Sequence, residues 1–469
     1  MPFLDRVNRW AEQRPRELAV VCGDDQLSWG QLRAAAAARA ASGEPTGEPA
    51  GILQQGNGVD LVVRWTAGVA QERMCAVLDP TWPDELTEPI RRRCAARLPA
   101  ARAPAQLRDG APGTAFLIGL TSGTTAVPKG YSRSRGSWQR SFEASISHFG
   151  LRPEDRVLAP GPLSASLNLY ALSECLYAGA AFATLPRFDG AAAHAVIASG
   201  GVTRLVLVPT MLRVLAKRGL ASGVTADALT AIVCAGQKLD PTTLETARRW
   251  APNAIIWEYY GAAELGFIAS RSHPPGAAAG QSGTCVGTAF SGVELAVLDD
   301  EGRTLPSGRP GTIALRSELV CDGYLWGDDG RALTRLGGWA TVRDQGFLRD
   351  GQLHVLGRAS EMINTGGLNV YPHEVESALA AVPGVADAVV AGLPDESRGE
   401  RVVAGVLPSS GPLSRLQLRS GLEARLAPAK RPQQYWQLQE LPLTGSGKLA
   451  RSVLRDWILE GDPRARLLR

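Results

Sequence analysis

The 469-residue sequence lacks any apolar stretch of the roughly eighteen residues that a membrane-spanning helix needs. Its first residues, Met1-Pro-Phe-Leu-Asp-Arg6, are soon followed by a polar helical pattern and do not have the form of a signal peptide. We therefore expect a cytoplasmic protein without a membrane span.

Cysteine is scarce and forms no pattern. The seven cysteines are an odd number, and none of them stands in a C-x-x-C pair. A disulfide framework and a zinc site are therefore disfavoured, and a reduced compartment fits better. Cys234 lies near the candidate active site, where we interpret it as a small buried apolar residue and not as a nucleophile.

The sequence also has no large excess of positive or negative charge. The formal net charge is +4, and the arginines are scattered along the chain, so nucleic acid binding is not indicated. An apolar content of 45% and a charged content of 20% are typical of a soluble globular protein. A chain of this length is too long for one ordinary core, and we expect two or three domains.

A phosphate-binding loop is predicted after the apolar run 115–120. Its residues are small or hydroxyl-bearing and end at a lysine: Thr121, Ser122, Gly123, Thr124, Thr125 and, beyond Pro128, Lys129. Small side chains let backbone N–H groups converge on an anion, and the lysine adds a positive charge. This is not a Walker A loop, because no Ser or Thr follows the lysine. Alone, such a run fits a polar surface turn equally well.

A second motif, Tyr260-Gly-Ala-Ala-Glu264, follows a predicted strand at 254–258. Gly261 would allow a sharp turn at the strand end. Tyr260 offers a flat face that can stack on adenine, and Glu264 offers a hard oxygen ligand for Mg²⁺. Alone the pentapeptide is weak evidence, because most loop glutamates are simply solvated.

Three charged residues complete the candidate site. Asp344 can accept hydrogen bonds from a ribose diol, and Arg358 presents a fixed fork to ribose or phosphate oxygens. Lys448, in the glycine-rich segment 442–451, can reach a distant anion. In isolation Asp344 also fits a turn residue and Lys448 a solvated loop lysine.

The order of elements predicts an α/β fold. Repeated strand–helix units up to about residue 264 indicate a large N-terminal domain of parallel-rich sheets with helices. Short strands with glycine-rich turns between about 282 and 356 indicate an antiparallel subdomain. A different pattern begins after Arg358 and predicts a small α+β C-terminal domain. The expected domains are 1–358 and 359–469.

Taken together, these motifs resemble in order and spacing those of the AMP-forming adenylating enzymes, which include acyl- and aryl-CoA ligases, nonribosomal adenylation domains and luciferases. The resemblance covers almost the whole chain. It implies that ATP phosphates bind at 121–129, with Thr124 and Lys129 acting in catalysis, and that Glu264 holds Mg²⁺. It also implies that Asp344 binds the ribose with Arg358 nearby, and that the small domain is mobile and brings Lys448 to the carboxylate and α-phosphate.

The resemblance places the substrate beside four small residues: Ala165, Gly236, Ala262 and Ala263. Two of them depart from the family pattern. Ala263 replaces a threonine whose hydroxyl usually touches the acyl phosphate, and Ala165 stands where many ligases have an aromatic or His gate. No aspartate stands where amino-acid-activating members hold an α-ammonium, so an α-amino acid is disfavoured.

Three functions stay open from the sequence. The first is an ATP-dependent ligase that activates a fatty or aromatic acid and passes the acyl group to CoA or to a carrier-protein thiol. The alternative is an enzyme of secondary metabolism that activates nitrite for attack by an aryl amine, for which the altered pocket at Ala165 and Ala263 is the only motive. The third, a non-catalytic acyl-binding module, is disfavoured by the intact Glu264, Asp344 and Lys448.

Overall fold

The computed structural model describes residues 3–42, 51–98, 106–121, 128–277, 283–328, 330, 332–358, 361–366, 368–409, 411–423, 425–443 and 449–468. None of the helices within these ranges combines the length and the apolar character that crossing a bilayer requires.

The largest sheet begins with parallel strands that are buried on both faces. Its parallel part runs in the order β1 (Leu18–Cys22), β8 (Ala181–Thr184), β7 (Arg156–Leu158), β9 (Arg204–Leu207), β10 (Ala231–Ala235) and β11 (Ile255–Ala262). Within β9, Val206 packs into one hydrophobic core while Leu205 and Leu207 pack into another. Helices must therefore cover both faces of these strands.

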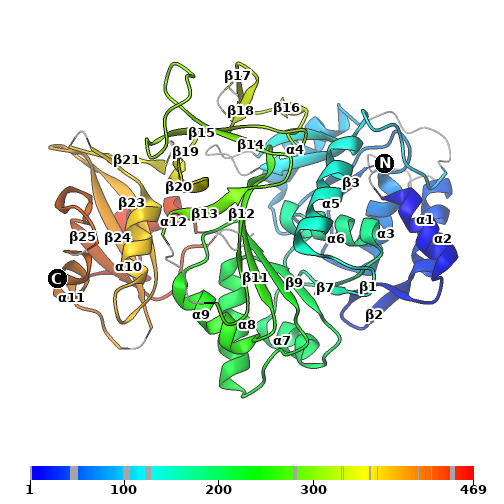
Figure 1. The fold of residues 1–469 in the computed structure, drawn as a ribbon, viewed down its shortest axis with the longest axis horizontal. Helices are drawn as coiled ribbons and strands as arrows, with labels where there is room; N and C mark the ends of the chain where they lie inside the picture. Colours follow the sequence, from blue (N-terminus) through cyan, green and yellow to red (C-terminus); the bar gives the residue numbers. More distant parts are fainter. Residues whose placement is uncertain are drawn as a thin grey trace.

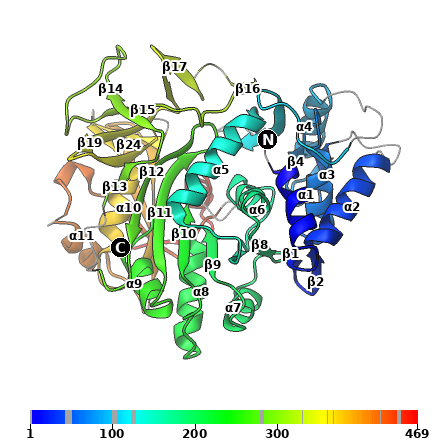
Figure 2. The same cartoon turned by 45° about the vertical axis from the view of Figure 1, so that its right-hand side comes forward.

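Two groups of helices provide that cover. The first group is α5 (Arg135–Phe149) and α6 (Ser166–Ala178), which lie to one side of β10 and β11 in Figure 2. The second group is α7 (Gly190–Ala198), α8 (Pro209–Ala221) and α9 (Pro241–Trp250). Figure 2 shows the N-terminal helices beyond α6: α1 (Leu4–Gln13), α2 (Trp29–Ser42), α3 (Val59–Gly68) and α4 (Asp84–Ala95). The same N-terminal part of the chain contains the hairpin strand β2 (Asp25–Ser28) and the short parallel pair β3 (Ile52–Leu53) and β4 (Ala76–Val77).

The same sheet continues beyond β11 as antiparallel strands. The order is β12 (Gly266–His273), β13 (Cys285–Ala289), β20 (Gln352–Arg358), β19 (Asp344–Arg349), β15 (Gly311–Arg316), β18 (Trp339–Thr341) and β17 (Thr334–Leu336), and β14 (Glu294–Leu298) pairs with β15. The expected antiparallel strands are present, and they form one continuous sheet with the parallel strands.

A three-stranded antiparallel sheet carries the segment on either side of the predicted phosphate loop. Its strands are β5 (Ala115–Thr121), β6 (Lys129–Ser134) and β16 (Gly323–Trp326). A side chain at Gly130 would collide with the Trp326 ring, because a Cβ there would lie 2.3 Å from Trp326 Cζ2. The missing side chain lets β16 pack closely against β6.

Residues from 361 onward form their own sheet and their own core. The strands are β21 (Ile363–Thr365), β22 (Leu368–Val370), β23 (Val385–Asp395), β24 (Gly399–Pro408), β25 (Gln434–Leu438) and β26 (Ala465–Leu467). The helices are α10 (Pro372–Ala380), α11 (Arg415–Glu423) and α12 (Arg451–Glu460), with a 3₁₀ turn at Pro428–Lys430. This small domain lies at the opposite end of the molecule from α1 and α2 (Figure 1). The predicted fold class, a large mixed α/β domain followed by a smaller α+β domain, is confirmed.

Candidate active site

The two arms of the predicted phosphate loop are strands paired with each other. Thr121 ends β5, Lys129 begins β6, and the two residues are direct partners in the antiparallel register. Ser122, Gly123, Thr124 and Thr125 lie outside the described residues. The register fixes where the loop leaves the sheet and where it returns, and it brings Thr121 and Lys129 together.

Glu264 lies in the turn between β11 and β12, where its side chain is buried. Its carboxylate accepts a hydrogen bond from the Tyr324 hydroxyl, and that hydroxyl lies 3.2 Å from Thr121 Oγ1. The backbone carbonyl of Glu264 also accepts a hydrogen bond from the Cys321 N–H at 2.7 Å. Glu264 is therefore joined to the arm of the phosphate loop through one tyrosine.

A buried arginine of β6 holds the same turn from another side. Arg133 donates to the Ala263 carbonyl at 2.7 Å and also to the Leu319 carbonyl. Its side chain is 3% exposed. Both bonds go to backbone oxygens, so they constrain the course of the chain beside Glu264 and leave the carboxylate to Tyr324.

The expectation that Gly261 makes a sharp turn at the strand end is wrong. Strand β11 continues through Ala262, and the turn follows at 263–265. Gly261 lies at an irregularity in the pairing with β12, where a Cβ would lie 2.6 Å from the Gly266 carbonyl oxygen. The position requires glycine because the opposing backbone approaches closely, not because the chain reverses there.

The predicted adenosine-binding residues form a second cluster. The Tyr260 hydroxyl donates to Asp344 Oδ2, and Arg358 Nε lies 3.6 Å from Asp344 Oδ1. Asp344 begins β19 and Arg358 ends β20, and these two residues are partners in the register. Asp344 Oδ1 is buried and has no hydrogen-bond donor among the described residues. A buried carboxylate oxygen that lies beside Tyr260 and receives no hydrogen bond from the described part of the chain is suited to accept one from a ribose hydroxyl.

The electrostatics of the two clusters are coupled. Burial raises the pKa of the Asp344 carboxyl, while the charge of Arg358 and the hydrogen bond from Tyr260 act in the opposite direction. The charge of Glu264 adds to the rise. Burial also raises the pKa of the Tyr260 and Tyr324 hydroxyls, so both remain neutral hydrogen-bond donors at neutral pH.

Lys448 lies outside the described residues, as do 444–447. The chain on either side of this segment is placed. Leu443 and Leu449 form an antiparallel bridge, and the Ala450 N–H donates to the Pro442 carbonyl at 2.8 Å. The ends of the lysine loop are therefore held together.

The first residue of α12 anchors that loop to the small domain. Arg451 forms ion pairs with Glu376 at 2.9 Å and with Glu361 at 2.7 Å. Glu376 Oε1 also accepts the Val390 N–H at 2.9 Å. Burial would raise the pKa of the Glu376 carboxyl, but the charge of Arg451, together with His373 and the hydrogen bond from the Val390 N–H, outweighs burial and lowers the pKa to about 2.

The four residues expected at the substrate lie in three places along the chain, since Ala262 and Ala263 are adjacent. Ala165 precedes α6 as its N-cap, Gly236 follows β10 with φ of 85°, Ala262 ends β11, and Ala263 begins the Glu264 turn.

A cavity of about 20 Å³ lies between α6 and strands β9 to β12, and none of those four residues lines it. Its walls include Tyr170, Glu174 and Tyr259. This volume holds about one water molecule, so we do not assign the cavity to a carboxylic acid.

Two residues that hold the parts of the site together were not predicted from the sequence. Tyr324 and Arg133 contact Thr121, Glu264 and Ala263, but neither belongs to a recognisable spacing. A tyrosine in a short apolar strand is usually read as a core residue. Only the folded arrangement brings β16 and β6 to the Glu264 turn.

The residues present fit a magnesium nucleotide. No group of three or more His, Cys, Asp or Glu side chains with the arrangement of a metal site is found in the described part of the chain. A single carboxylate such as Glu264 nevertheless suits Mg²⁺, which is commonly held by one or two carboxylates together with substrate phosphates. Asp344 Oδ1, which accepts no hydrogen bond from the described residues, suits a ribose hydroxyl.

Comparisons with known proteins agree with these motifs. The AMP-binding enzyme family matches residues 62–325, and the AMP-binding enzyme C-terminal domain matches residues 374–448. An uncharacterized acyl-CoA ligase, YhfT of Bacillus subtilis, is 32% identical over 347 residues, which are 74% of this chain and 69% of the relative. Indoleacetate–CoA ligase of Aromatoleum aromaticum is 34% identical over 354 residues, 74% of this chain and 68% of the relative.

A solved structure shows the same fold over both domains. ATP-bound MatB from Rhodopseudomonas palustris superposes with a TM-score of 0.82 at 23% identity, covering 97% of this chain and 98% of MatB. The chain therefore belongs to the AMP-binding enzymes, the AMP-forming adenylating superfamily that its motifs predicted, and it is an adenylating ligase of the acid–thiol type.

Proposed function

We propose that this chain uses ATP and Mg²⁺ to convert a fatty or aromatic carboxylic acid into its acyl-adenylate, and then transfers the acyl group to CoA. In the first step a carboxylate oxygen attacks the α-phosphorus and pyrophosphate leaves. In the second step a thiol sulfur attacks the acyl carbon and AMP leaves. Both curated relatives are named as CoA ligases, one of them for indoleacetate, and this supports CoA as the acceptor.

The link from Thr121 through Tyr324 to Glu264 carries the proposal. It couples the arm of the phosphate loop to the carboxylate that we assign to Mg²⁺. When bound, Mg²⁺ supplies positive charge to the phosphate oxygens. Tyr324 orients the Glu264 carboxylate, so that its free oxygen is held in place before the nucleotide arrives.

Asp344, Tyr260 and the two lysines have separate roles. Asp344 accepts hydrogen bonds from the ribose through Oδ1, which has no hydrogen-bond donor among the described residues, and the charge of Arg358 opposes the rise in the pKa of that carboxyl. Tyr260 fixes the other oxygen of Asp344 and presents its ring to the adenine. Lys129 and Lys448 would reduce the repulsion between the attacking carboxylate and the phosphates, because each adds a positive charge.

The pocket substitutions bear on the acid but not on the chemistry. Ala263 and Ala165 remove side chains near the acyl group, and neither removes a charge that adenylation needs. A bulky or planar acid is the substrate class that this loss of volume favours. The backbone carbonyl of Ala263 stays fixed by Arg133 in spite of the substitution.

The test is ATP–pyrophosphate exchange against a panel of fatty and aromatic acids, followed by thioester formation with CoA. The proposal expects exchange with at least one acid and a CoA thioester of the same acid. Acyl transfer only to a carrier-protein thiol would replace CoA as the acceptor. If pyrophosphate exchange occurs with nitrite plus an aminoarene and with none of the acids, the nitrite-activating function would replace the one proposed.

A further inference from the structure

An arginine of the large domain reaches across to the small domain. Arg213 lies on α8, and its side chain is 15% exposed. Its Nη1 lies 2.5 Å from Asp387 Oδ2 and 3.3 Å from the Ala386 carbonyl oxygen. Asp387 and Ala386 belong to β23, so one guanidinium bonds two neighbouring groups of the other domain.

Residues of the large domain hold this guanidinium in place through two further hydrogen bonds. Arg213 Nη2 donates to Asp240 Oδ2 at 2.8 Å, and Arg213 Nε donates to Thr243 Oγ1 at 2.8 Å. Asp240 is itself held as the N-cap of α9, where its Oδ1 accepts the Thr243 N–H at 2.9 Å. Two of the three nitrogens are thus bound within the large domain, and Nη1 is left to point at the small domain.

In the small domain, an irregularity in β23 positions Asp387 and Ala386 for this contact. The pairing of β23 with β24 shifts register between Val385 and Asp387, which leaves the Ala386 carbonyl outside the ladder. Such bulges re-aim side chains. Asp387 Oδ1 accepts the Ala388 N–H at 2.9 Å, so the carboxylate is fixed with Oδ2 toward Arg213.

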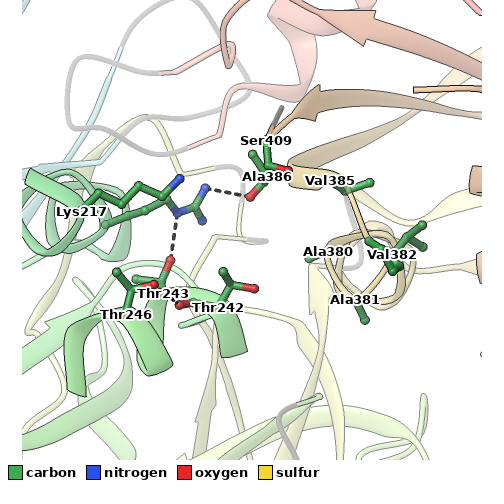
Figure 3. Close-up of a pocket in the computed structure, with 13 residues that line it drawn as sticks. Lys217, Thr242, Thr243, Thr246, Ala380, Ala381, Val382, Val385, Ala386 and Ser409 are labelled. Carbon is green, nitrogen blue, oxygen red and sulfur yellow. Dashed lines mark hydrogen bonds between the residues drawn. The ribbon is translucent and has the colours of Figure 1, made fainter. Parts of the chain in front are cut away.

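The surfaces beside this contact do not pack closely. A cavity of about 340 Å³ separates Thr242 and Thr246 of α9 from Ala380, Ala381 and Val382 (Figure 3). Dashed lines in Figure 3 mark the bonds of the guanidinium to Thr243 and Ala386. Apolar packing therefore contributes little at this place, where the polar contacts of Arg213 join the two domains.

We infer that Arg213 is a positioning residue for catalysis: its bonds to Asp387 and Ala386 hold the small domain, and the lysine loop that it carries, in one orientation against the large domain. Without Arg213, Asp240 and Asp387 would face each other across the interface as two uncompensated carboxylates. The contact between the domains therefore depends on Arg213, whose charge lies between the two carboxylates.

The first test measures domain orientation and does not depend on the proposed function. The seven native cysteines are buried, so spin labels can be placed on Val224→Cys and Leu416→Cys, at two exposed positions in different domains. Electron–electron double resonance then gives the distance distribution. We expect one dominant distance in the wild type and in Arg218→Gln, an exposed control on the same helix. We expect a broadened or shifted distribution in Arg213→Gln and in Asp387→Asn, with at least as large a change in Arg213→Gln because it leaves the two carboxylates facing each other.

The double variant tests whether the two residues act together. Arg213→Gln combined with Asp387→Asn should change the distribution no more than Arg213→Gln alone, because the second substitution removes one of the two facing carboxylates. An unchanged distribution in both single variants would overturn the inference. If Arg213→Gln fails to fold, the nearly isosteric Asp387→Asn decides alone.

The second test rests on the proposed function. The ratio of the pyrophosphate exchange rate to the rate of acyl transfer from a preformed adenylate should change by about tenfold or more in both single variants, with melting temperatures close to the wild type. Equal losses in both rates would contradict a positioning role. If the wild type activates no acid, the proposed function fails and the distance measurement still decides the inference.

Discussion

The Tyr324 hydroxyl donates a hydrogen bond to the Glu264 carboxylate and lies 3.2 Å from Thr121 Oγ1. The three residues come from β16, from the turn after β11 and from the end of β5. One tyrosine therefore ties the metal-binding carboxylate of the proposed site to the arm of the phosphate loop. The ring of Tyr324 packs edge-on against Tyr131 at 6.3 Å, which fixes the direction of the hydroxyl.

Tyr324→Phe removes this hydroxyl and keeps the ring. We expect kcat/KM for pyrophosphate exchange to fall about tenfold to a hundredfold, because a hydrogen bond to a charged group contributes about 1.5–3 kcal/mol. The Mg²⁺ concentration needed for ATP binding, measured by titration calorimetry, should rise. Tyr435→Phe is the matched control, since the Tyr435 hydroxyl is buried without a partner among the described residues. Equal effects of the two variants would contradict the role of Tyr324.

Asp344→Asn replaces the ribose acceptor by an amide. We expect AMP affinity, measured by calorimetry, to fall about tenfold or more, because the Asn amide cannot accept at both positions. Asp350→Asn is the control at an exposed turn with φ of 52°, a conformation that asparagine accepts. An affinity unchanged in Asp344→Asn would remove this residue from the nucleotide site.

The pH dependence of AMP binding provides a separate check of Asp344. Burial raises the pKa of this carboxyl above its ordinary value of 3.8. Protonation removes an acceptor, so the affinity of the wild type should fall as the pH is lowered through that raised pKa. Calorimetry over a pH series should show a flatter profile for Asp344→Asn. Parallel profiles for the two proteins would contradict the assignment.

Glu376→Gln tests the anchor of the lysine loop. The folded pKa of Glu376, about 2, lies below its ordinary value of 4.5. A depressed carboxyl pKa contributes stability that is present above pH 4.5 and is lost as the pH falls toward 2, on the order of 3 kcal/mol at neutral pH. Urea unfolding of the small domain should show the deficit of Glu376→Gln shrinking below pH 4.5. Glu396→Gln, at an exposed turn, should show no such trend.

Lys448→Ala removes a positive charge from the loop whose ends meet at Leu443 and Leu449. We expect adenylate formation to be abolished, while acyl transfer from a supplied adenylate persists and the melting temperature stays unchanged. The two half-reactions, measured separately, check this. An unchanged adenylation rate would contradict the role assigned to the lysine.

The sequence alone allowed the fold class and the order of the motifs to be predicted, because periodicity and turn residues are local signals. Tyr260 and Asp344 were each assigned to the nucleotide, but their mutual hydrogen bond was not predicted, since 84 positions separate them. Arg133 was counted among scattered charges, although it lies buried against two carbonyls. A turn was predicted at Gly261 because this glycine stands at the end of a predicted strand. The close approach of the Gly266 backbone, which is the actual reason for the glycine, depends on the pairing of β11 with β12.

The contact between Arg213 and Asp387 had no signal in the sequence at all. The two residues are 174 positions apart and lie in different domains. Their pairing depends on a β-bulge at Ala386 and on the N-cap of α9, and neither feature determines by itself which residue lies across the interface. Such contacts follow from the arrangement of domains, which local patterns do not specify.

A crystal structure with AMP bound tests the central claim most directly. The account predicts ribose hydroxyls within hydrogen-bond distance of Asp344 Oδ1, the adenine against the Tyr260 ring, and the phosphate between Thr121 and Glu264. A nucleotide bound away from both Asp344 and Glu264 would contradict the account.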